Sequence, residues 1–232
     1  KVAGVRRIVV VSPPNADGKI DPLTIVAANL CGANEIYKTG GVQSIAALSN
    51  GTKSILKVDK IVGPGGAFVT TAKYLTSNET GIDMLAGPTE LGIIADNSTN
   101  PQLVSLDLIS QAEHSNDTFC YLITTSQKLA NSVNNIISEL IPKIKRSTFV
   151  KSSLKYNGFI AICKTNSDMI KLANILAPEH LQIMTKNPEL LSSQINTAGL
   201  ILLGGNTPSS ASDYLLGSNH ILPTNGFGKI RG

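Results

Sequence analysis

The sequence contains no tryptophan, and aromatic residues make up only 4% of its 232 positions. Lysine and arginine are scattered, and no aromatic platform accompanies the densest basic patch, within residues 143–151. Proteins that hold single-stranded nucleic acid combine a basic groove with aromatic side chains on which bases stack. The net charge of +4 therefore gives no support for nucleic-acid binding.

Long apolar runs and paired cysteines are also missing. No apolar stretch approaches the ~20 residues that a membrane-spanning helix needs, so we expect no membrane association and a cytoplasmic location. Cys31, Cys120 and Cys163 are widely separated and form no Cys-x-x-Cys pair, which argues against a disulfide framework and a thiolate zinc site. We expect all three to be buried, reduced thiols.

Glycine and small aliphatic residues are abundant, which suits a layered α/β fold better than a β-sandwich. Residues 8–11 form an unbroken β-branched run, typical of a strand buried on both faces of a parallel sheet. The series of strand, glycine turn and helix then recurs three times before residue 76. We therefore predict an α/β fold of two Rossmann-like, incomplete doubly wound lobes with mostly parallel sheets.

Residues 81–90 interrupt this rhythm and indicate a crossover between two lobes, which we place at residues 1–88 and 89–232. Asn166 or Ser167 is expected to cap the helix that ends at Leu176. The strands expected in the second lobe are at residues 91–95, 119–123, 159–162, 181–184 and 200–203.

Residues 63–66 read Gly-Pro-Gly-Gly and lie between a predicted strand and a predicted helix, so their amides could bind a phosphate. The G-x-G-x-x-G spacing is absent, and no acidic residue occupies the expected ribose-binding position. A tight turn that needs glycine for steric reasons is the simpler explanation.

Gln111 and His114 stand at the end of a predicted helix that carries apolar residues at helical spacing. Because they are three residues apart, they share one face of that helix, while Glu113 points elsewhere. An amide oxygen and an imidazole nitrogen could supply half of a metal's ligands. The alternative is an ordinary helix cap or solvated helix end.

Glu179 and His180 are adjacent, just after Pro178 ends a predicted helix and before a predicted strand. Proline would hold the pair in a fixed turn. The imidazole could act as a base near neutral pH while the carboxylate polarises a water molecule. The alternative is a Glu–His pair on the surface.

The chain has three histidines, and the third, His220, follows Asp213 in a polar segment. Asp213 offers a hard oxygen ligand, so that Gln111, His114 and Asp213 are three possible ligands of a divalent metal. The fourth position could be taken by His220 or left open for substrate, which is the catalytic arrangement.

Six motifs occur in order along essentially the whole chain and together resemble the histidinol dehydrogenase family. Such an ordered series is far more specific than any one of its members. The motifs lie at residues 40–43, 60–65, 83–90, 110–114, 177–181 and 218–224.

The resemblance implies a zinc- and NAD-dependent oxidation of L-histidinol, through histidinal, to L-histidine. It implies that the first lobe binds NAD and the second binds zinc and substrate. The site residues that it implies are Gln111, His114 and Asp213 as zinc ligands that also contact substrate, His180 as the general base, Glu179 as the group that activates water, Thr89 and His220 as further substrate contacts, and Gln43 and Gly66 as cofactor contacts.

The chain departs from the family pattern at several positions. Gly66 stands where the family usually has an asparagine that touches the cofactor, Thr89 replaces a serine but keeps its hydroxyl, and Ser209 replaces a glutamate. The family's N-terminal region, with a tyrosine-bearing cofactor loop, is not in this sequence. Neither is its C-terminal segment, which carries a glutamate and the remaining zinc-ligating histidine to the partner's site in an intertwined homodimer.

The chain begins at Lys1 without a methionine and stops in a glycine-rich stretch. We therefore expect it to be part of a longer protein, with weak zinc binding and little or no turnover by itself. Two other functions remain open from the residues: a zinc-dependent hydrolase on the same ligands, with Glu179 as base for a metal-bound water, or a non-catalytic fragment that retains the fold.

Overall fold

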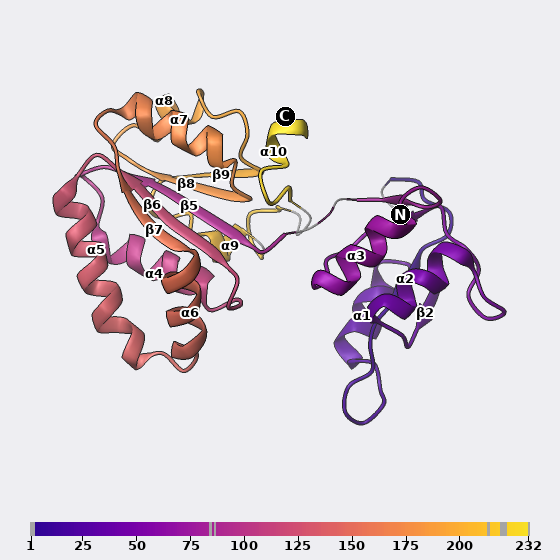
Figure 1. The fold of residues 1–232 in the computed structure, drawn as a ribbon. Coiled ribbons are helices and arrows are strands. Elements are labelled where there is room, and N and C mark those ends of the chain that lie inside the picture. The colour runs from indigo at the N-terminus through magenta and orange to yellow at the C-terminus, as the bar shows by residue number, and fades with distance from the viewer. Residues whose placement is uncertain (1–2, 84, 86, 213, 219–221, 232) are drawn as a thin grey trace. The chain divides into compact units, whose positions relative to one another are not determined.

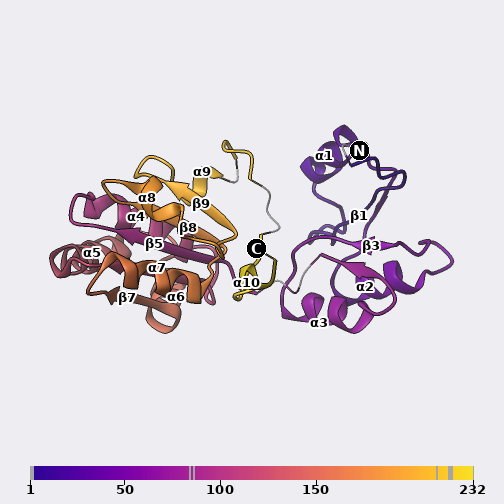
Figure 2. The same cartoon turned by 90° about the horizontal axis from the view of Figure 1, so that it is seen from above.

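The computed structural model describes residues 3–83, 85, 87–212, 214–218 and 222–231. The chain forms two compact units, Lys1–Leu85 and Ala86–Gly232 (Figures 1 and 2). The division between the units falls after Leu85, and the boundary that we predict from the sequence falls after residue 88. Each unit has a hydrophobic core of its own.

Unit 1 alternates short parallel strands with helices, as predicted. Its sheets are two parallel pairs, β1 with β2 and β3 with β4. Strand β4, which the sequence pattern did not reveal, lies within the expected crossover. The elements of unit 1 are β1 (Val9–Val11), α1 (Pro22–Leu30), β2 (Glu35–Tyr37), α2 (Gly41–Asn50), β3 (Lys60–Ile61), α3 (Ala67–Thr76) and β4 (Gly81–Ile82).

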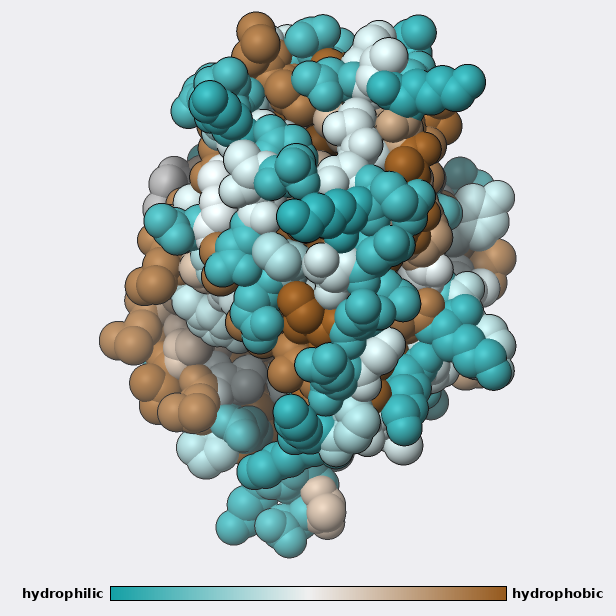
Figure 3. Space-filling model, turned by 90° about the vertical axis from the view of Figure 1, so that its left-hand side faces the viewer, coloured by the Kyte–Doolittle hydropathy of each residue, from teal (hydrophilic) through white to brown (hydrophobic). Residues whose placement is uncertain are grey.

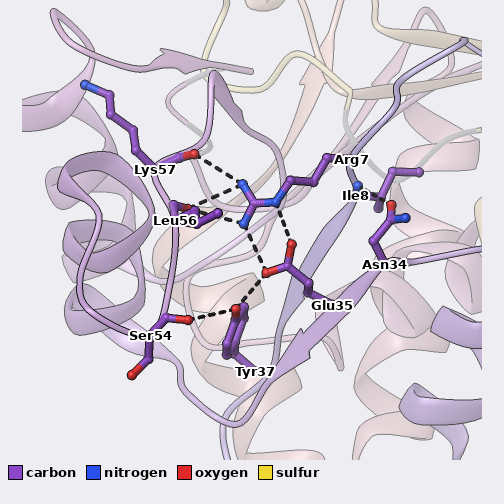
Figure 4. A network of polar contacts seen from close by, with 8 residues as sticks. All are labelled: Arg7, Ile8, Asn34, Glu35, Tyr37, Ser54, Leu56 and Lys57. Atoms are coloured by element: carbon purple, nitrogen blue, oxygen red, sulfur yellow. Dashed lines mark hydrogen bonds and ion pairs between the residues drawn. The ribbon is translucent and has the colours of Figure 1, made fainter.

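A network around Glu35 ties β2 to the start of unit 1 (Figure 4). The Arg7 guanidinium donates to both carboxylate oxygens of Glu35, at 2.5 and 3.0 Å, and the Tyr37 hydroxyl donates to one of them at 2.6 Å. Arg7 also donates to the backbone oxygen of Lys57 at 3.2 Å. Hydrogen bonds from Arg7 and then Tyr37 lower the pKa of Glu35 from its usual 4.5 to about 2.

We expect Glu35→Gln to be less stable than the wild type near neutral pH and to lose this disadvantage in acid. A carboxyl whose pKa is lowered by folding stabilises the folded state above its unfolded pKa, and this contribution disappears as the pH falls from 4.5 through about 2. Urea unfolding of both proteins across that range, followed by circular dichroism, measures the difference. Glu79→Gln, an exposed change of the same charge, should show no such trend.

Unit 2 is built on one five-stranded, all-parallel sheet in the order β7-β6-β5-β8-β9. The chain starts in the middle at β5, moves out to β7, and returns to β8 on the other side, which is the doubly wound pattern. The elements of unit 2 are β5 (Glu90–Ala95), α4 (Pro101–Ala112), β6 (Phe119–Thr124), α5 (Gln127–Leu140), η1 (Ile141–Lys143), α6 (Ser147–Asn157), β7 (Gly158–Ile162), α7 (Asn166–Leu176), β8 (His180–Met184), α8 (Pro188–Ser192), β9 (Leu200–Leu203), α9 (Ser209–Ser212) and α10 (Gly228–Arg231).

The two faces of this sheet have separate cores. On one face, alternate residues of β5 and β6 pack with Val104, Leu108 and Ala112 of α4 and with α5 and α6. On the other face, the intervening strand residues pack against α7 and α8. Met184 belongs to the α4 face, while Leu181 and Ile183 belong to the α7 face. Because side chains alternate along a strand, His180 and Gln182 also point to the α4 face.

Helix α5 shows why this layer forms. The Ser126 hydroxyl accepts the backbone N–H of Leu129 at 3.1 Å and caps the helix. One stripe of α5, including Leu129 and Val133, is buried, whereas Lys128 and Glu139 are exposed. Figure 3 shows the side of unit 2 that carries α5, where hydrophilic side chains cover much of the surface and leave smaller hydrophobic patches between them.

Gly92 in β5 leaves room for the buried ring of Tyr121 on the adjacent strand β6. A Cβ at position 92 would lie 2.7 Å from the Tyr121 Cζ and Oη atoms. We therefore expect Gly92→Ala to destabilise the protein by about 1–3 kcal/mol, because a close-packed core must shift to admit it. Urea unfolding measures the effect, and Gly66→Ala, whose Cβ meets no described atom within 4 Å, is the control.

Several local expectations need correction. Thr165, and not Asn166 or Ser167, caps α7, and it forms a capping box with Asp168. Cys31 is exposed, although Cys120 is buried and Cys163 partly so, and all three are free thiols. The sequence pattern did not predict α6. Within the described residues, no helix is long and apolar enough to cross a membrane.

Candidate active site

The predicted residues of unit 2 that the structure describes lie toward the amino-terminal edge of its sheet. Thr89 precedes β5, and His180 begins β8. Helix α4 runs back from the end of β5, and Gln111 and His114 at its end lead into β6. Ligands of open parallel sheets usually bind at the carboxyl ends of the strands, so this cluster lies at the opposite edge.

His180 is a strand residue in this structure. Helix α7 ends at Leu176, its C-cap residue Ala177 adopts a left-handed conformation with φ 49°, and Pro178 follows. His180 then enters β8, where it pairs with Leu91 of β5 and Leu200 of β9. His180 is only 4% exposed and Glu179 only 8%. Glu179 and His180 are therefore not a surface pair, and only Glu179 remains in the expected turn.

The surroundings of His180 select one tautomer. Its Nδ1 atom lies 3.2 Å from the backbone oxygen of Glu90 and 3.6 Å from Oε2 of Glu179. A carbonyl oxygen accepts hydrogen bonds and cannot donate them. This hydrogen bond therefore requires the proton on Nδ1, and in the neutral ring the lone pair is on Nε2.

Glu90, which the sequence pattern did not single out as a site residue, holds Glu179 in place. The Glu179 N–H donates to Oε2 of Glu90 at 3.2 Å, and the Glu90 N–H donates to Oε2 of Glu179 at 3.0 Å. Oε1 of Glu90 also accepts the N–H of Asn225 at 2.9 Å. Burial raises the pKa of Glu90, against the hydrogen bonds that lower it. One feature could have drawn attention to Glu90: it is a charged residue at the start of an otherwise apolar strand, β5, whose six residues are all buried.

Asp107 of α4 and Gln182 of β8 relate the end of α4 to the start of β8. Burial raises the pKa of Asp107 to about 6, against the opposing effect of the nearby Gln182 side chain. Gln111 is one turn, about 5.4 Å, beyond Asp107 on the same helix face. His180 lies two residues, roughly 6.6 Å, from Gln182 in the same direction, because α4 runs against β8. Gln111 and His180 therefore both lie toward the amino-terminal edge of the sheet.

The predicted metal ligands are brought together in part. The Ser209 hydroxyl donates to Oε1 of Gln111 at 3.3 Å, so the amide oxygen points toward α9, the helix that Asp213 follows. His114 is exposed, and its N–H donates to the backbone oxygen of Gln111 at 3.0 Å. Asp213 and His220 lie outside the described residues. In the described part of the chain, no three His, Cys, Asp or Glu residues form a metal-binding group.

The predicted cofactor residues lie in unit 1, at the amino ends of two helices. Gln43 is exposed in the first turn of α2, and Gly66 is the N-cap residue of α3. Neither helix has a side-chain cap, so their first amides can meet an anionic ligand. A Cβ at position 66 would meet no described atom within 4 Å, so the structure has room there for the family's usual side chain.

A buried ion pair anchors the glycine turn that precedes α3. The ammonium of Lys73 donates to a carboxylate oxygen of Asp83 and, at 2.9 Å, to the backbone oxygen of Gly63. The other oxygen of Asp83 accepts the N–H of Gly63 at 2.8 Å. Both backbone groups of Gly63, its N–H and its carbonyl oxygen, are therefore held by this ion pair.

Comparison with known proteins identifies the family. The family model described as histidinol dehydrogenase matches residues 1–232, the whole chain. The chain belongs to the histidinol dehydrogenase family. It is 44% identical over 230 residues to histidinol dehydrogenase of Oceanobacillus iheyensis, covering 99% of this chain and 54% of that protein. It is 46% identical over 230 residues to the Methanocaldococcus jannaschii protein of the same name, covering 99% and 53%.

Solved structures agree with this assignment to the histidinol dehydrogenase family. The crystal structure of histidinol dehydrogenase from Elizabethkingia anophelis superposes with a TM-score of 0.94 at 38% identity, covering 98% of this chain and 53% of that one. A propionaldehyde dehydrogenase from Clostridium phytofermentans, at 14% identity and a TM-score of 0.53, shares the fold alone. The predicted family and α/β fold with parallel sheets are confirmed. The chain spans about half the length of the relatives it matches.

Proposed function

We propose that this chain carries the catalytic core of an NAD-linked, zinc-dependent oxidation of L-histidinol through L-histidinal to L-histidine. The main support is the buried His180, whose Nδ1 atom lies 3.2 Å from the Glu90 carbonyl oxygen at the sheet edge toward which Gln111 also lies. We propose further that the protein works in the cytoplasm as a homodimer with a small-molecule substrate, as the family resemblance implies.

The donor set at the end of α4 suits zinc. Gln111 and His114 would contribute an amide oxygen and an imidazole nitrogen, and Asp213 a carboxylate. The Ser209 hydroxyl supports this assignment because it turns the Gln111 oxygen toward α9. Zinc, when bound, would anchor the imidazole and amine of the substrate. Thr89 and His220 are the proposed additional substrate contacts.

Unit 1 suits a dinucleotide, although Gly66 lacks the side chain that the family uses there. The uncapped amino ends of α2 and α3 would face the pyrophosphate, with Gln43 as a further contact. NAD, when bound, would accept hydride. Because Gly66 offers only its backbone, we expect NAD to bind more weakly than it would to an asparagine at this position.

The side chains of unit 2 would manage the protons of both oxidations. In the first, Nε2 of His180 takes the hydroxyl proton of histidinol while the carbinol carbon gives up hydride, and the aldehyde forms. In the second, Glu179 takes a proton from water as the water oxygen adds to the aldehyde carbon, and it passes that proton to the former aldehyde oxygen, which gives the neutral hydrate. His180, having released its first proton to solvent, then takes a proton from the hydrate while the same carbon gives up hydride, which leaves the carboxylic acid. Each oxidation thus releases one proton and one hydride.

The test is to supply L-histidinol, NAD and zinc to the intact protein and to residues 1–232 alone. We expect the intact protein to form two NADH for each histidine and to stop when a chelator removes zinc. Metal-dependent cleavage of esters or amides without any NAD requirement would instead favour a hydrolase. No NADH from the intact protein would overturn the proposal.

A further inference from the structure

Glu90 and Glu179 exchange hydrogen bonds between neighbouring strands, each accepting the backbone N–H of the other. Both residues are only 8% exposed. Two buried carboxylates repel each other and lose hydration, so an arrangement that serves stability alone would more simply use neutral groups. Stability alone therefore does not explain why both positions, 90 and 179, carry glutamate.

The exchange also sets the position of His180. The Glu90 side chain accepts the N–H of the peptide that links Pro178 to Glu179, while the Glu90 backbone oxygen accepts from Nδ1 of His180. One residue therefore contacts the backbone of Glu179 and the ring of His180 at once. A shift of Glu90 would move both groups.

A third segment of the chain is joined at the same carboxylate. Oε1 of Glu90 accepts the N–H of Asn225, and the neighbouring Thr224 hydroxyl accepts the N–H of Gly87 at 2.7 Å. Residues 224–225 are thus attached to the approach to β5 at two points. The Glu90 carboxylate joins three stretches of chain at the sheet edge that carries the candidate site.

We propose that Glu90 is a positioning residue that holds Glu179 and His180 in register with the amino end of β5 and thereby keeps the His180 proton on Nδ1. This inference rests on the proposed role of His180 as a base. A carboxylate is needed because it presents two acceptor oxygens to two N–H groups, whereas glutamine has only one acceptor. Glu90→Gln should therefore break one of the two contacts while preserving size and shape.

The direct test is nitrogen-15 NMR of the histidine side chains in the intact protein. Among the three histidines of this chain, His180 is identified by the signal that disappears in His180→Gln. We expect wild-type His180 to show a protonated Nδ1 and an unprotonated Nε2 when neutral. In Glu90→Gln we expect this preference to weaken toward a mixture of tautomers. Glu139→Gln, an exposed change of the same charge on α5, should leave the spectrum of His180 unchanged.

Steady-state kinetics of the Glu90 variants provide a second test. We expect Glu90→Gln to lower kcat by about 10- to 100-fold with little change in KM, because a misplaced base slows proton transfer more than binding. Glu90→Asp keeps both oxygens on a shorter side chain and should therefore retain more activity than Glu90→Gln. If Glu90→Gln does not fold, Glu90→Asp is compared with the wild type in its place.

Two results would overturn the inference about Glu90. The first is a wild-type His180 that carries its proton on Nε2, and the second is a Glu90→Gln protein whose tautomer and kcat match the wild type. The NMR measurement needs no turnover. If the protein forms no NADH but His180 shows the expected tautomer and its dependence on Glu90, the proposed function fails while the positioning by Glu90 stands.

Discussion

His180→Gln is expected to lower kcat for histidinol oxidation by about 10²–10⁴-fold, the usual contribution of a positioned general base. Glutamine can still donate an amide N–H toward the Glu90 carbonyl, but it cannot accept a proton. Because hydroxide must then replace the lost base, the residual rate should rise with pH. Steady-state NADH formation by the wild type and the variant measures both effects.

The same variant should keep its fold, because the imidazole is exchanged for a side chain of similar volume at the start of β8. Thermal unfolding and zinc content are the checks. Glu139→Gln, exposed on α5, should keep the full wild-type kcat. If a correctly folded His180→Gln protein keeps wild-type kcat, His180 is not the base and the proton steps proposed above are wrong.

Lys73→Met is expected to destabilise unit 1 by about 3–5 kcal/mol, the typical loss when one partner of a buried ion pair is removed. The Lys73 and Asp83 side chains are only 3% and 9% exposed. Methionine fills much of the lysine volume, but it leaves the Asp83 carboxylate in a poorly hydrated place without its ammonium partner. The glycine turn also loses the contact from Lys73 to the Gly63 oxygen.

Hydrogen exchange of unit 1 amides is the suitable measurement, because it reports on this unit separately from unit 2. Lys53→Met, an exposed change of the same charge in unit 1, should change exchange little. The double variant Lys73→Met/Asp83→Asn should recover much of the loss, since the neutral amide can still accept the Gly63 N–H. Equal exchange in Lys73→Met and the wild type would show that the ion pair contributes nothing to stability.

Local sequence signals predicted the elements well where a single short-range interaction decides them. Asp21 and Asn100 cap α1 and α4 with proline at the first helical position, as their sequence neighbours indicate. The error at α7 was one residue, because Thr165 and Asp168 form a capping box that competes with Asn166. Strand β4 was missed because two residues carry too little pattern to recognise.

The candidate site was predicted in its residue types but not in its supports. Glu179 and His180 were visible as a pair of groups able to move protons. Their partner Glu90 was not, because it is 89 residues away from Glu179 in the chain and only strand pairing brings the two together. The contact between Asp107 and Gln182 was hidden for the same reason.

By itself, the sequence determined the alternation of strands and helices, the parallel α/β class and the family, since these depend on periodicity, capping residues and ordered motifs. The tertiary structure alone decided that the candidate site lies at the amino edge of the second sheet and that His180 is buried with its Nδ1 atom against the Glu90 carbonyl. These features depend on hydrogen bonds between residues far apart in the chain, and only the pairing of β5 with β8 sets their geometry.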